Sequence, residues 1–306
     1  MSRFALRYPD DILVGRACIG RSAFANRLAE ERKRIVLIEE KYHTCVEGLA
    51  SFARGIGMTD AVIGLSGGID SSLVACMCVD AFGAEHVHGY MLPGPYSSEH
   101  SLVDAQELAL NLGIRAERIS IGKPFEAFVD ALGDHCIMAR GLAAENTQAR
   151  CRMTVLMALS NAHGWMMVNT GNKSEAMMGY STLYGDTAGA YAPIGGLYKT
   201  DVFAMSRWVN EEALRKEGRI LIPERVLTKP PSAELAPDQR DEDTLGSYDE
   251  LDRLLINYCE RGMDRSALIA AGYDAAEVDR VKNRVDSYAF KRALEPPFPA
   301  IEYGLN

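Results

Sequence analysis

The sequence predicts an α/β fold in which a doubly wound parallel sheet is flanked by helices and followed by a helical C-terminal region. Compact apolar runs predict buried strands over residues 61–65, 87–92, 118–121 and 165–169. Longer segments with apolar residues at helical spacing separate these runs. Strands that alternate with helices in this way are typical of a parallel sheet with helices on both faces.

Composition and charge exclude several classes of protein. The 306 residues are 47% hydrophobic and 25% charged, and no apolar run approaches the length of a membrane span. The net charge of −9 argues against broad binding to nucleic acid. Seven cysteines lie without Cys-x-x-Cys or zinc-ligand spacing, as expected for reduced thiols. We therefore expect a cytoplasmic protein with no secretion signal, no membrane partner and no nucleic-acid partner.

The whole chain, residues 1–306, is expected to form a single domain. Its predicted parts are an irregular N-terminus over 1–21, a long helix over 22–57, the parallel α/β core over 58–220, an active-site loop over 221–246 and the helical region over 247–306. Helices are predicted over residues 71–79, 98–112, 145–163, 199–217, 247–260, 264–271 and 274–292.

The long N-terminal helix carries an apolar stripe at three- and four-residue steps, formed by Ile35, Ile38, Tyr42, Val46 and Leu49. This stripe has no evident place in the helix layers that cover the sheet. We therefore expect a homodimer that forms through this helix and part of the helix over 145–163.

The most informative segment joins the first strand to the helix that follows it. Ser66, Gly67 and Gly68 form a tight turn, and a helix follows from Ser71. Converging backbone N–H groups and the positive end of the helix dipole make such a corner an anion site. Asp70 would repel phosphate unless a cation lay between them, so we predict that Asp70 binds Mg²⁺. The alternative is an ordinary strand–turn–helix corner.

Residues 169–175 repeat this arrangement of strand end, turn and helix start. Ligands of open α/β sheets gather at the carboxyl ends of the strands, so the two loops should face one crevice. Glu175 then adds a second carboxylate to the metal site predicted at Asp70. Alternatively, Glu175 only complements the dipole of the helix that it begins.

The segment Ser66-Gly-Gly-Ile-Asp-Ser-Ser72 resembles the pyrophosphate loop of the ATP pyrophosphatase family, whose members split ATP into AMP and pyrophosphate. Six later segments resemble NAD⁺ synthetase in that family's order, and the resemblance covers residues 30–292. They are Asn146-Thr-Gln-Ala-Arg150-Cys-Arg-Met153, Asn169-Thr-Gly-Asn-Lys-Ser-Glu175, Gly179-Tyr-Ser-Thr-Leu-Tyr-Gly-Asp186, Pro193-Ile-Gly-Gly-Leu-Tyr-Lys199-Thr200, Lys229-Pro-Pro-Ser-Ala-Glu-Leu235 and Asp241-Glu-Asp-Thr-Leu-Gly-Ser-Tyr248.

This resemblance implies an adenine nucleotide alpha hydrolase-like fold and a two-step reaction. The nicotinate carboxylate of deamido-NAD⁺ attacks ATP to give an adenylate and pyrophosphate, and ammonia then displaces AMP. Asp70 and Lys199 are implied as catalytic residues, with Lys199 at the α-phosphate, while Asp70 and Glu175 would hold Mg²⁺. ATP contacts are implied at Gly64, Leu65, Ser66, Gly67, Gly68, Ile69, Ser71, Ser72, Thr170, Lys199 and Ser232. Contacts to deamido-NAD⁺ are implied at Asn146, Arg150, Lys173, Asp186 and Lys291.

One segment departs from the pattern of the small ammonia-dependent synthetases. Leu183 and Ala190 stand where those proteins tend to carry Lys and Asp, and the segment is more similar to the synthetase half of glutamine-dependent enzymes. Those enzymes carry an N-terminal glutaminase, for which residues 1–60 are too few. We therefore expect free ammonia as the nitrogen donor unless a separate glutaminase chain docks. The role of the loop over 183–190 stays open.

Two other functions remain open from the sequence. The first is another pyrophosphate-loop ligase, such as a GMP synthetase or a tRNA-modifying enzyme, although the acidic charge disfavours a tRNA partner. The second is a nucleotide-binding regulator without activity. Such a regulator would carry a damaged metal pair, whereas Asp70 and Glu175 are both present.

Overall fold

The fold is built around a small parallel sheet. The computed structural model describes residues 37–136, 140–237 and 239–303. Within them, the strands pair in the order β3-β2-β1-β4 and are all parallel. They are β1 (Ala61–Gly64), β2 (Val87–Met91), β3 (Arg115–Arg118) and β4 (Met166–Met167). The predicted α/β fold with a parallel sheet is confirmed.

Helices cover both faces of this sheet, because the side chains of β1 alternate between two apolar cores. Ile63 packs in a core with α2 (Ile69–Phe82), α3 (Glu99–Leu112), α7 (Lys199–Glu217) and the helix over 37–56. Val62 packs on the opposite face with α4 (Gly122–Leu132) and α5 (Leu142–His163). The sheet is therefore doubly wound, as predicted.

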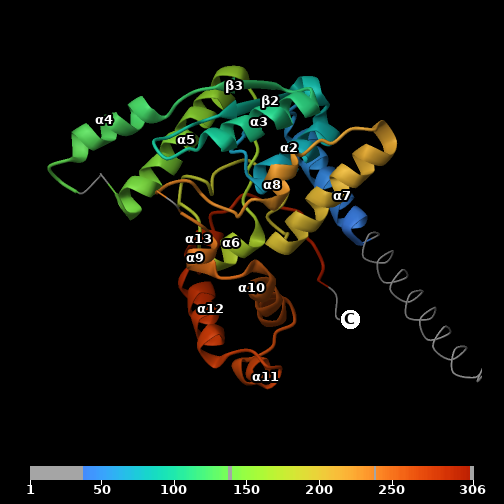
Figure 1. The fold of residues 1–306 in the computed structure, drawn as a ribbon, viewed down its shortest axis with the longest axis vertical. Coiled ribbons are helices and arrows are strands. Elements are labelled where there is room, and N and C mark those ends of the chain that lie inside the picture. The colour runs from blue at the N-terminus through green and yellow to red at the C-terminus, as the bar shows by residue number, and fades with distance from the viewer. Residues whose placement is uncertain (1–36, 137–139, 238, 304–306) are drawn as a thin grey trace, which may run out of the picture.

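The C-terminal helices form their own apolar core below the sheet in Figure 1. They are α10 (Tyr248–Leu255), a π-helical turn η2 (Ile256–Glu260), α11 (Arg265–Ala270), α12 (Ala275–Ser287) and α13 (Ala289–Arg292). Met178 of α6 (Lys173–Met178) and Tyr198 insert into this core. The segments that carry Glu175 and Lys199 are thus packed against the helical region.

Several predicted boundaries were wrong. The third strand ends at Arg118, where the predicted run begins, because the edge strand β3 is mostly exposed and polar. The apolar residues after it, Ile119 and Ile121, instead pack in the core beneath α4 and α5. Helix α4, the 3₁₀ turn η1 (Ala84–His86) and two short helices inside the predicted loop, α8 (Glu224–Thr228) and α9 (Glu242–Leu245), were not predicted. The predicted helix over 274–292 is interrupted at Tyr288.

The argument for a dimer through the N-terminal helix is also wrong for its described part. Ile38, Tyr42 and Leu49 are buried in the chain's own core, and Ile35 lies outside the described residues. The Tyr42 ring lies 5.1 Å from that of Trp208, and its hydroxyl donates to Asp80. The homodimer stays a prediction without this support, and light scattering at micromolar concentration tests it. In the described part of the chain, no helix has the length and apolarity that crossing a bilayer requires.

Candidate active site

The candidate site lies where β1 pairs with β4, at one end of the strand order. The chain leaves β1 through α2 towards β2, whereas it reaches β4 through α5, which lies on the other face. Such a switch point leaves a crevice at the carboxyl ends of the two strands. A cavity of about 360 Å³ occupies this position, and it is lined by parts of the segments 64–71, 167–176, 180–188, 229–235 and 295–298. The two predicted loops therefore face one cavity, as expected.

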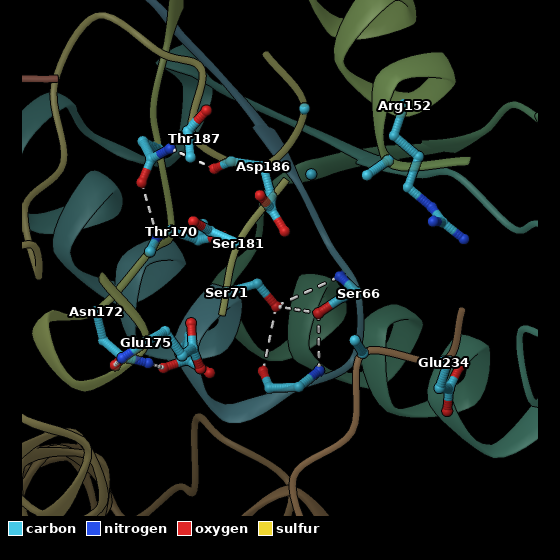
Figure 2. Close-up of a pocket in the computed structure, with 18 of the residues that line it drawn as sticks. Ser66, Ser71, Arg152, Thr170, Asn172, Glu175, Ser181, Asp186, Thr187 and Glu234 are labelled. Carbon is cyan, nitrogen blue, oxygen red and sulfur yellow. Dashed lines mark hydrogen bonds between the residues drawn. The ribbon is translucent and has the colours of Figure 1, made fainter. Parts of the chain in front are cut away.

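The glycine-rich loop is held by hydrogen bonds among its own hydroxyl groups. Ser66 Oγ lies 2.9 Å from Ser71 Oγ and accepts a bond from the Gly68 N–H (Figure 2). Ser72 Oγ donates to the Gly68 carbonyl oxygen. Gly68 is the N-cap of α2 and provides no side chain to cap it. N–H groups in the first turn of α2 therefore face the cavity without a capping side chain, which is the arrangement that binds a phosphate.

Gly67 is required by the backbone of this loop. Its φ is +74°, and a Cβ at this position would overlap the carbonyl group of Ser101. Gly218, at the end of α7, has a similar φ of +71° but no atom near the place of a Cβ. The two glycines thus share a left-handed backbone conformation, but only Gly67 has a close contact and lies in the loop at the cavity.

Gly67→Ala is expected to lower the affinity for ATP, the ligand predicted from the sequence, by about tenfold or more. Both alanine variants bear the left-handed backbone strain of about 1–2 kcal/mol, but only Gly67→Ala must also move the loop. Isothermal titration calorimetry of both variants measures the difference. Wild-type ATP affinity in Gly67→Ala, or an equal loss in Gly218→Ala, would contradict this account.

A buried charge cluster joins the two loops. Lys199, at the first position of α7, has a side chain that is only 1% exposed. Its Nζ lies 2.5 Å from Asp70 Oδ2 and 3.0 Å from Glu175 Oε1. Asn172 donates to Asp70 Oδ1 and accepts from the Glu175 N–H, which caps α6. A single ammonium group therefore lies between the two carboxylates that were predicted to bind metal.

The electrostatics of this cluster are those of a site with excess negative charge. Burial raises the pKa of Glu175 to about 8; Lys199 opposes this shift and Asp70 adds to it. Burial also raises the pKa of Asp241. Burial lowers the pKa of Lys199, but the carboxylates of Asp70 and Glu175 outweigh it and the net shift is upward. The Lys199 ammonium thus stays charged, and its single positive charge does not fully offset the negative charge of the carboxylates around it.

The donor set fits a magnesium ion only when a ligand completes it. Among the described residues, no group of three His, Cys, Asp or Glu side chains is arranged to hold a metal. Asp70 and Glu175 provide two carboxylates, and Mg²⁺ is usually held in this way, with phosphate oxygens and water as its other ligands. The metal role of these two residues stays a prediction.

Glu175→Gln is expected to raise the stability of the ligand-free protein at pH 8. Because the pKa in the folded state, about 8, exceeds the ordinary value of 4.5, the folded protein holds this proton more tightly than the unfolded chain. The stabilising contribution of the protonated group is complete below pH 4.5 and is lost as the pH rises to 8. The melting temperatures of the wild type and Glu175→Gln, measured between pH 5 and 9 without divalent cations, should therefore differ at pH 8 and converge at low pH.

Glu212→Gln is the matched control for this measurement. Hydrogen bonds from Arg215 and Lys216 lower the pKa of Glu212 to about 2. Its stabilisation is present above the ordinary pKa and is lost as the pH falls towards 2, so this variant should be slightly less stable at pH 8. A Glu175→Gln protein that is no more stable than the wild type at pH 8 would contradict the prediction.

Most predicted ATP and metal residues line the cavity. They are Gly64, Leu65, Ser66, Gly68, Ile69, Asp70, Ser71, Thr170, Glu175, Lys199 and Ser232. Gly67 and Ser72 lie in the same loop but face away from the cavity, where they shape the turn.

Of the predicted dinucleotide contacts, only Asp186 lines the cavity, and burial raises its pKa to about 6. The side chain of Asn146 accepts from Thr182 Oγ1, and Arg150 donates to the Leu183 carbonyl oxygen. Lys291 donates to the carbonyl oxygens of Gly179 and Ser181. These three side chains therefore hold the loop over 179–187 rather than reach into the cavity.

Lys173 lies away from the cavity as well. Its Nζ pairs with Glu260 Oε1 at 2.6 Å, and it faces the rings of Tyr198 and Tyr303. This ion pair joins the start of α6 to the helical C-terminal region.

Several lining residues were missed by the sequence analysis. Arg152 lines the cavity in place of Arg150, because residues two apart on a helix point to different sides. In Figure 2, Arg152 and Glu234 lie on one side of the cavity, and Asn172 and Glu175 lie on the other. Ser181 Oγ is buried without a hydrogen-bond partner among the described residues, so it is free to bind a ligand. Helical spacing places Arg152 on one face with the lining residues Ala149 and Leu156, but it does not by itself say that this face meets the cavity.

A doubly wound sheet with a glycine-rich loop and a carboxylate–lysine cluster at its switch point defines an adenine nucleotide alpha hydrolase-like protein, and solved structures of that fold superpose on the chain. The chain belongs to the NAD synthase family, whose model matches residues 41–295.

Curated relatives support this assignment. The glutamine-dependent NAD(+) synthetase of Thermotoga maritima is 43% identical over 255 residues, which are 83% of this chain and 44% of the relative. That of Synechocystis sp. is 44% identical over 260 residues, which are 85% of this chain and 46% of the relative. The chain thus spans about half the length of these relatives.

Solved structures resemble the chain closely in fold. An NMN synthetase from Francisella tularensis has a TM-score of 0.70 at 29% identity, covering 83% of this chain and 95% of that one. An NH3-dependent NAD synthetase from Campylobacter jejuni has a TM-score of 0.67 at 27% identity, with the same coverage. A glutamine-dependent NAD+ synthetase from Acinetobacter baumannii, in complex with ADP, has a TM-score of 0.60 at 35% identity, covering 88% of this chain and 48% of that one.

Proposed function

We propose that the chain catalyses the ATP-dependent amidation of deamido-NAD⁺ to NAD⁺, with release of AMP and pyrophosphate. The observation that carries this proposal is the buried ammonium of Lys199 between Asp70 and Glu175, beside the uncapped start of α2. Family membership and the relative in complex with ADP support ATP as the co-substrate. As with the family's other members, the reaction class is carbon–nitrogen ligation.

In this proposal, each group has a defined part in the first step. The glycine-rich loop and the first turn of α2 bind the β- and γ-phosphates through backbone N–H and serine hydroxyl groups. Asp70 and Glu175 would hold Mg²⁺, which would neutralise charge on the phosphates. Lys199 places its ammonium at the α-phosphate. A carboxylate oxygen of the nicotinate then forms a bond to the α-phosphorus, and the bond to pyrophosphate breaks.

The second step needs little from the protein except position and exclusion of water. Ammonia forms a bond to the carbonyl carbon of the adenylate, and AMP leaves with the former carboxylate oxygen. The proton released by nitrogen passes to a base, and Asp186 is a cavity carboxyl whose raised pKa of about 6 suits that transfer.

We propose ammonia as the nitrogen donor. The chain covers 95% of the NH3-dependent NAD synthetase from Campylobacter jejuni, which supports free ammonia. The glutamine-dependent relatives instead support a second candidate, a synthetase subunit that a separate glutaminase chain supplies. The loop over 183–190 is not assigned to either kind of enzyme.

The choice of acceptor is also open to test. The neighbour named NMN synthetase is covered over 95% of its length, so the deamido form of NMN is a specific second acceptor. We favour deamido-NAD⁺ because the family model and the curated relatives name NAD.

One experiment tests donor and acceptor together. The purified chain is incubated with ATP, Mg²⁺ and either deamido-NAD⁺ or deamido-NMN, with ammonium or glutamine as the nitrogen source. We expect NAD⁺ from deamido-NAD⁺ with ammonium alone. Turnover of the purified chain on glutamine, with ammonium removed, would contradict ammonia as the donor. Turnover on glutamine only after a separate glutaminase chain is added would favour the glutaminase-fed subunit. Absence of AMP and pyrophosphate with both acceptors would contradict the function.

A further inference from the structure

Helix α7 begins without a cap of its own. Its N-cap residue, Tyr198, provides no side-chain hydrogen bond to the first turn. Asp252, on α10, provides one instead: its Oδ2 accepts from the Thr200 N–H at 2.8 Å. Its Oδ1 accepts from Ser174 Oγ, which itself accepts from the Lys199 N–H at 2.9 Å. The free N–H groups at the start of α7 are therefore satisfied by residues from two other elements.

The same carboxylate fixes the start of α6. Ser174 is fully buried and directly precedes Glu175, so its bond to Asp252 holds the turn from which Glu175 extends. Asp252 is itself only 1% exposed. Burial raises the pKa of Asp252, and its hydrogen bonds from Ser174 and Thr200 oppose this shift. One side chain thus joins Ser174 and Thr200, the residues next to Glu175 and Lys199.

Helix α10 also contacts the other end of the Lys199 side chain. The ring of Tyr248 lies 5.3 Å from Lys199 Nζ. Tyr248 and Asp252 are four residues apart on α10 and therefore lie on the same face. The helix is linked to the Lys199 N–H through Asp252 and Ser174, and its Tyr248 lies beside the Lys199 ammonium.

We propose that Asp252 is a positioning residue for the reaction, which acts through the hydrogen bonds of its carboxylate to Ser174 and the Thr200 N–H. It sets the place of the Lys199 ammonium relative to Glu175 and makes the helical C-terminal region part of the catalytic assembly. The kinetic part of this inference rests on the proposed function. The geometric part concerns the position of Lys199 alone.

The test compares Asp252→Ala and Ser174→Ala with a control that loses equivalent bonds elsewhere. Asn210, also on α7 and 9% exposed, accepts from the N–H groups of Leu221 and Ile222 and does not line the cavity. Asn210→Ala should therefore lose stability but keep the wild-type kcat. Asp252→Ala should lose about 10²-fold in kcat, the scale of a 1 Å misplacement of a catalytic group, with a smaller change in the KM for ATP.

A second readout does not depend on turnover. The ligand-free proteins are treated with a small acetylating reagent, and mass spectrometry follows modification of Lys199 relative to the exposed Lys216. Lys199 should be modified faster in Asp252→Ala than in the wild type or Asn210→Ala. If the proposed function fails but Lys199 labelling changes as expected, the positioning role still stands.

Three results would overturn the inference. The first is unchanged labelling of Lys199 in Asp252→Ala. The second is a wild-type kcat in that variant, and the third is an equal kcat loss in Asn210→Ala at equal stability. If Asp252→Ala does not fold, Ser174→Ala decides by the same two readouts. It keeps the bond from the Thr200 N–H to Asp252 but removes both bonds of Ser174 Oγ, to the Lys199 N–H and to Asp252 Oδ1.

Discussion

Lys199→Met is expected to abolish pyrophosphate release, with a fall in kcat of about 10³-fold or more. The ammonium is the positive group that lies between Asp70 and Glu175, and in the proposed reaction it meets the charge that develops at the α-phosphate. Methionine keeps the length and the apolar stem of the side chain but removes this charge. Single-turnover release of pyrophosphate from labelled ATP measures the effect.

Lys41→Met is the matched control for that variant. Lys41 pairs with Asp201 at 2.8 Å and is partly buried, but it does not line the cavity. Its replacement removes an ion pair of comparable geometry from the same face of the sheet and should leave the turnover rate near that of the wild type. A Lys199→Met protein that retains pyrophosphate release at the rate of Lys41→Met would rule out the assigned role of Lys199.

Asp70→Asn is expected to prevent adenylate formation while leaving the fold intact. Asparagine keeps the shape of the side chain and removes the negative charge that the predicted magnesium site needs. Lys199 still pairs with Glu175 in this variant. The release of pyrophosphate should fall by about 10²-fold or more at low Mg²⁺. A titration of Mg²⁺ against pyrophosphate release, with circular dichroism as the check on folding, measures both effects.

Asp80→Asn provides the control on the same helix. Asp80 lies near the other end of α2, where it accepts from the Tyr42 hydroxyl, and it does not line the cavity. Its variant should keep the wild-type Mg²⁺ dependence. Near-wild-type pyrophosphate release by Asp70→Asn at low Mg²⁺ would show that Asp70 does not hold the metal.

The parts of the site that sequence predicted well are those in which backbone geometry and function coincide. A strand, a glycine turn and a helix start can form only a few structures, so residues 61–72 specified the corner, and the anion site at this corner stays a prediction. The switch point then followed from the order of strands and helices, which placed Asp70 and Glu175 at one cavity. Lys199 lies there because a third element, α7, begins at the same edge.

What sequence did not predict depends on the direction of side chains. Arg150 and Arg152 lie in the same predicted helix, and only the packing of α5 on the sheet decides that Arg152 faces the cavity. Lys173 turns towards Glu260 because the helical C-terminal region packs against α6. The contacts of Asp252 join residues 52 and 78 positions apart, and no local periodicity carries such information.

The fate of the carboxylate oxygen tests the central claim, adenylation of the nicotinate carboxylate in the cavity between β1 and β4, most directly. Deamido-NAD⁺ labelled with oxygen-18 in its nicotinate carboxylate is converted with ATP, Mg²⁺ and ammonium, and the AMP is examined by mass spectrometry. Attack of the carboxylate on the α-phosphate predicts that one labelled oxygen is transferred to each AMP, while pyrophosphate stays unlabelled. Unlabelled AMP in a reaction that produces NAD⁺ would contradict the account.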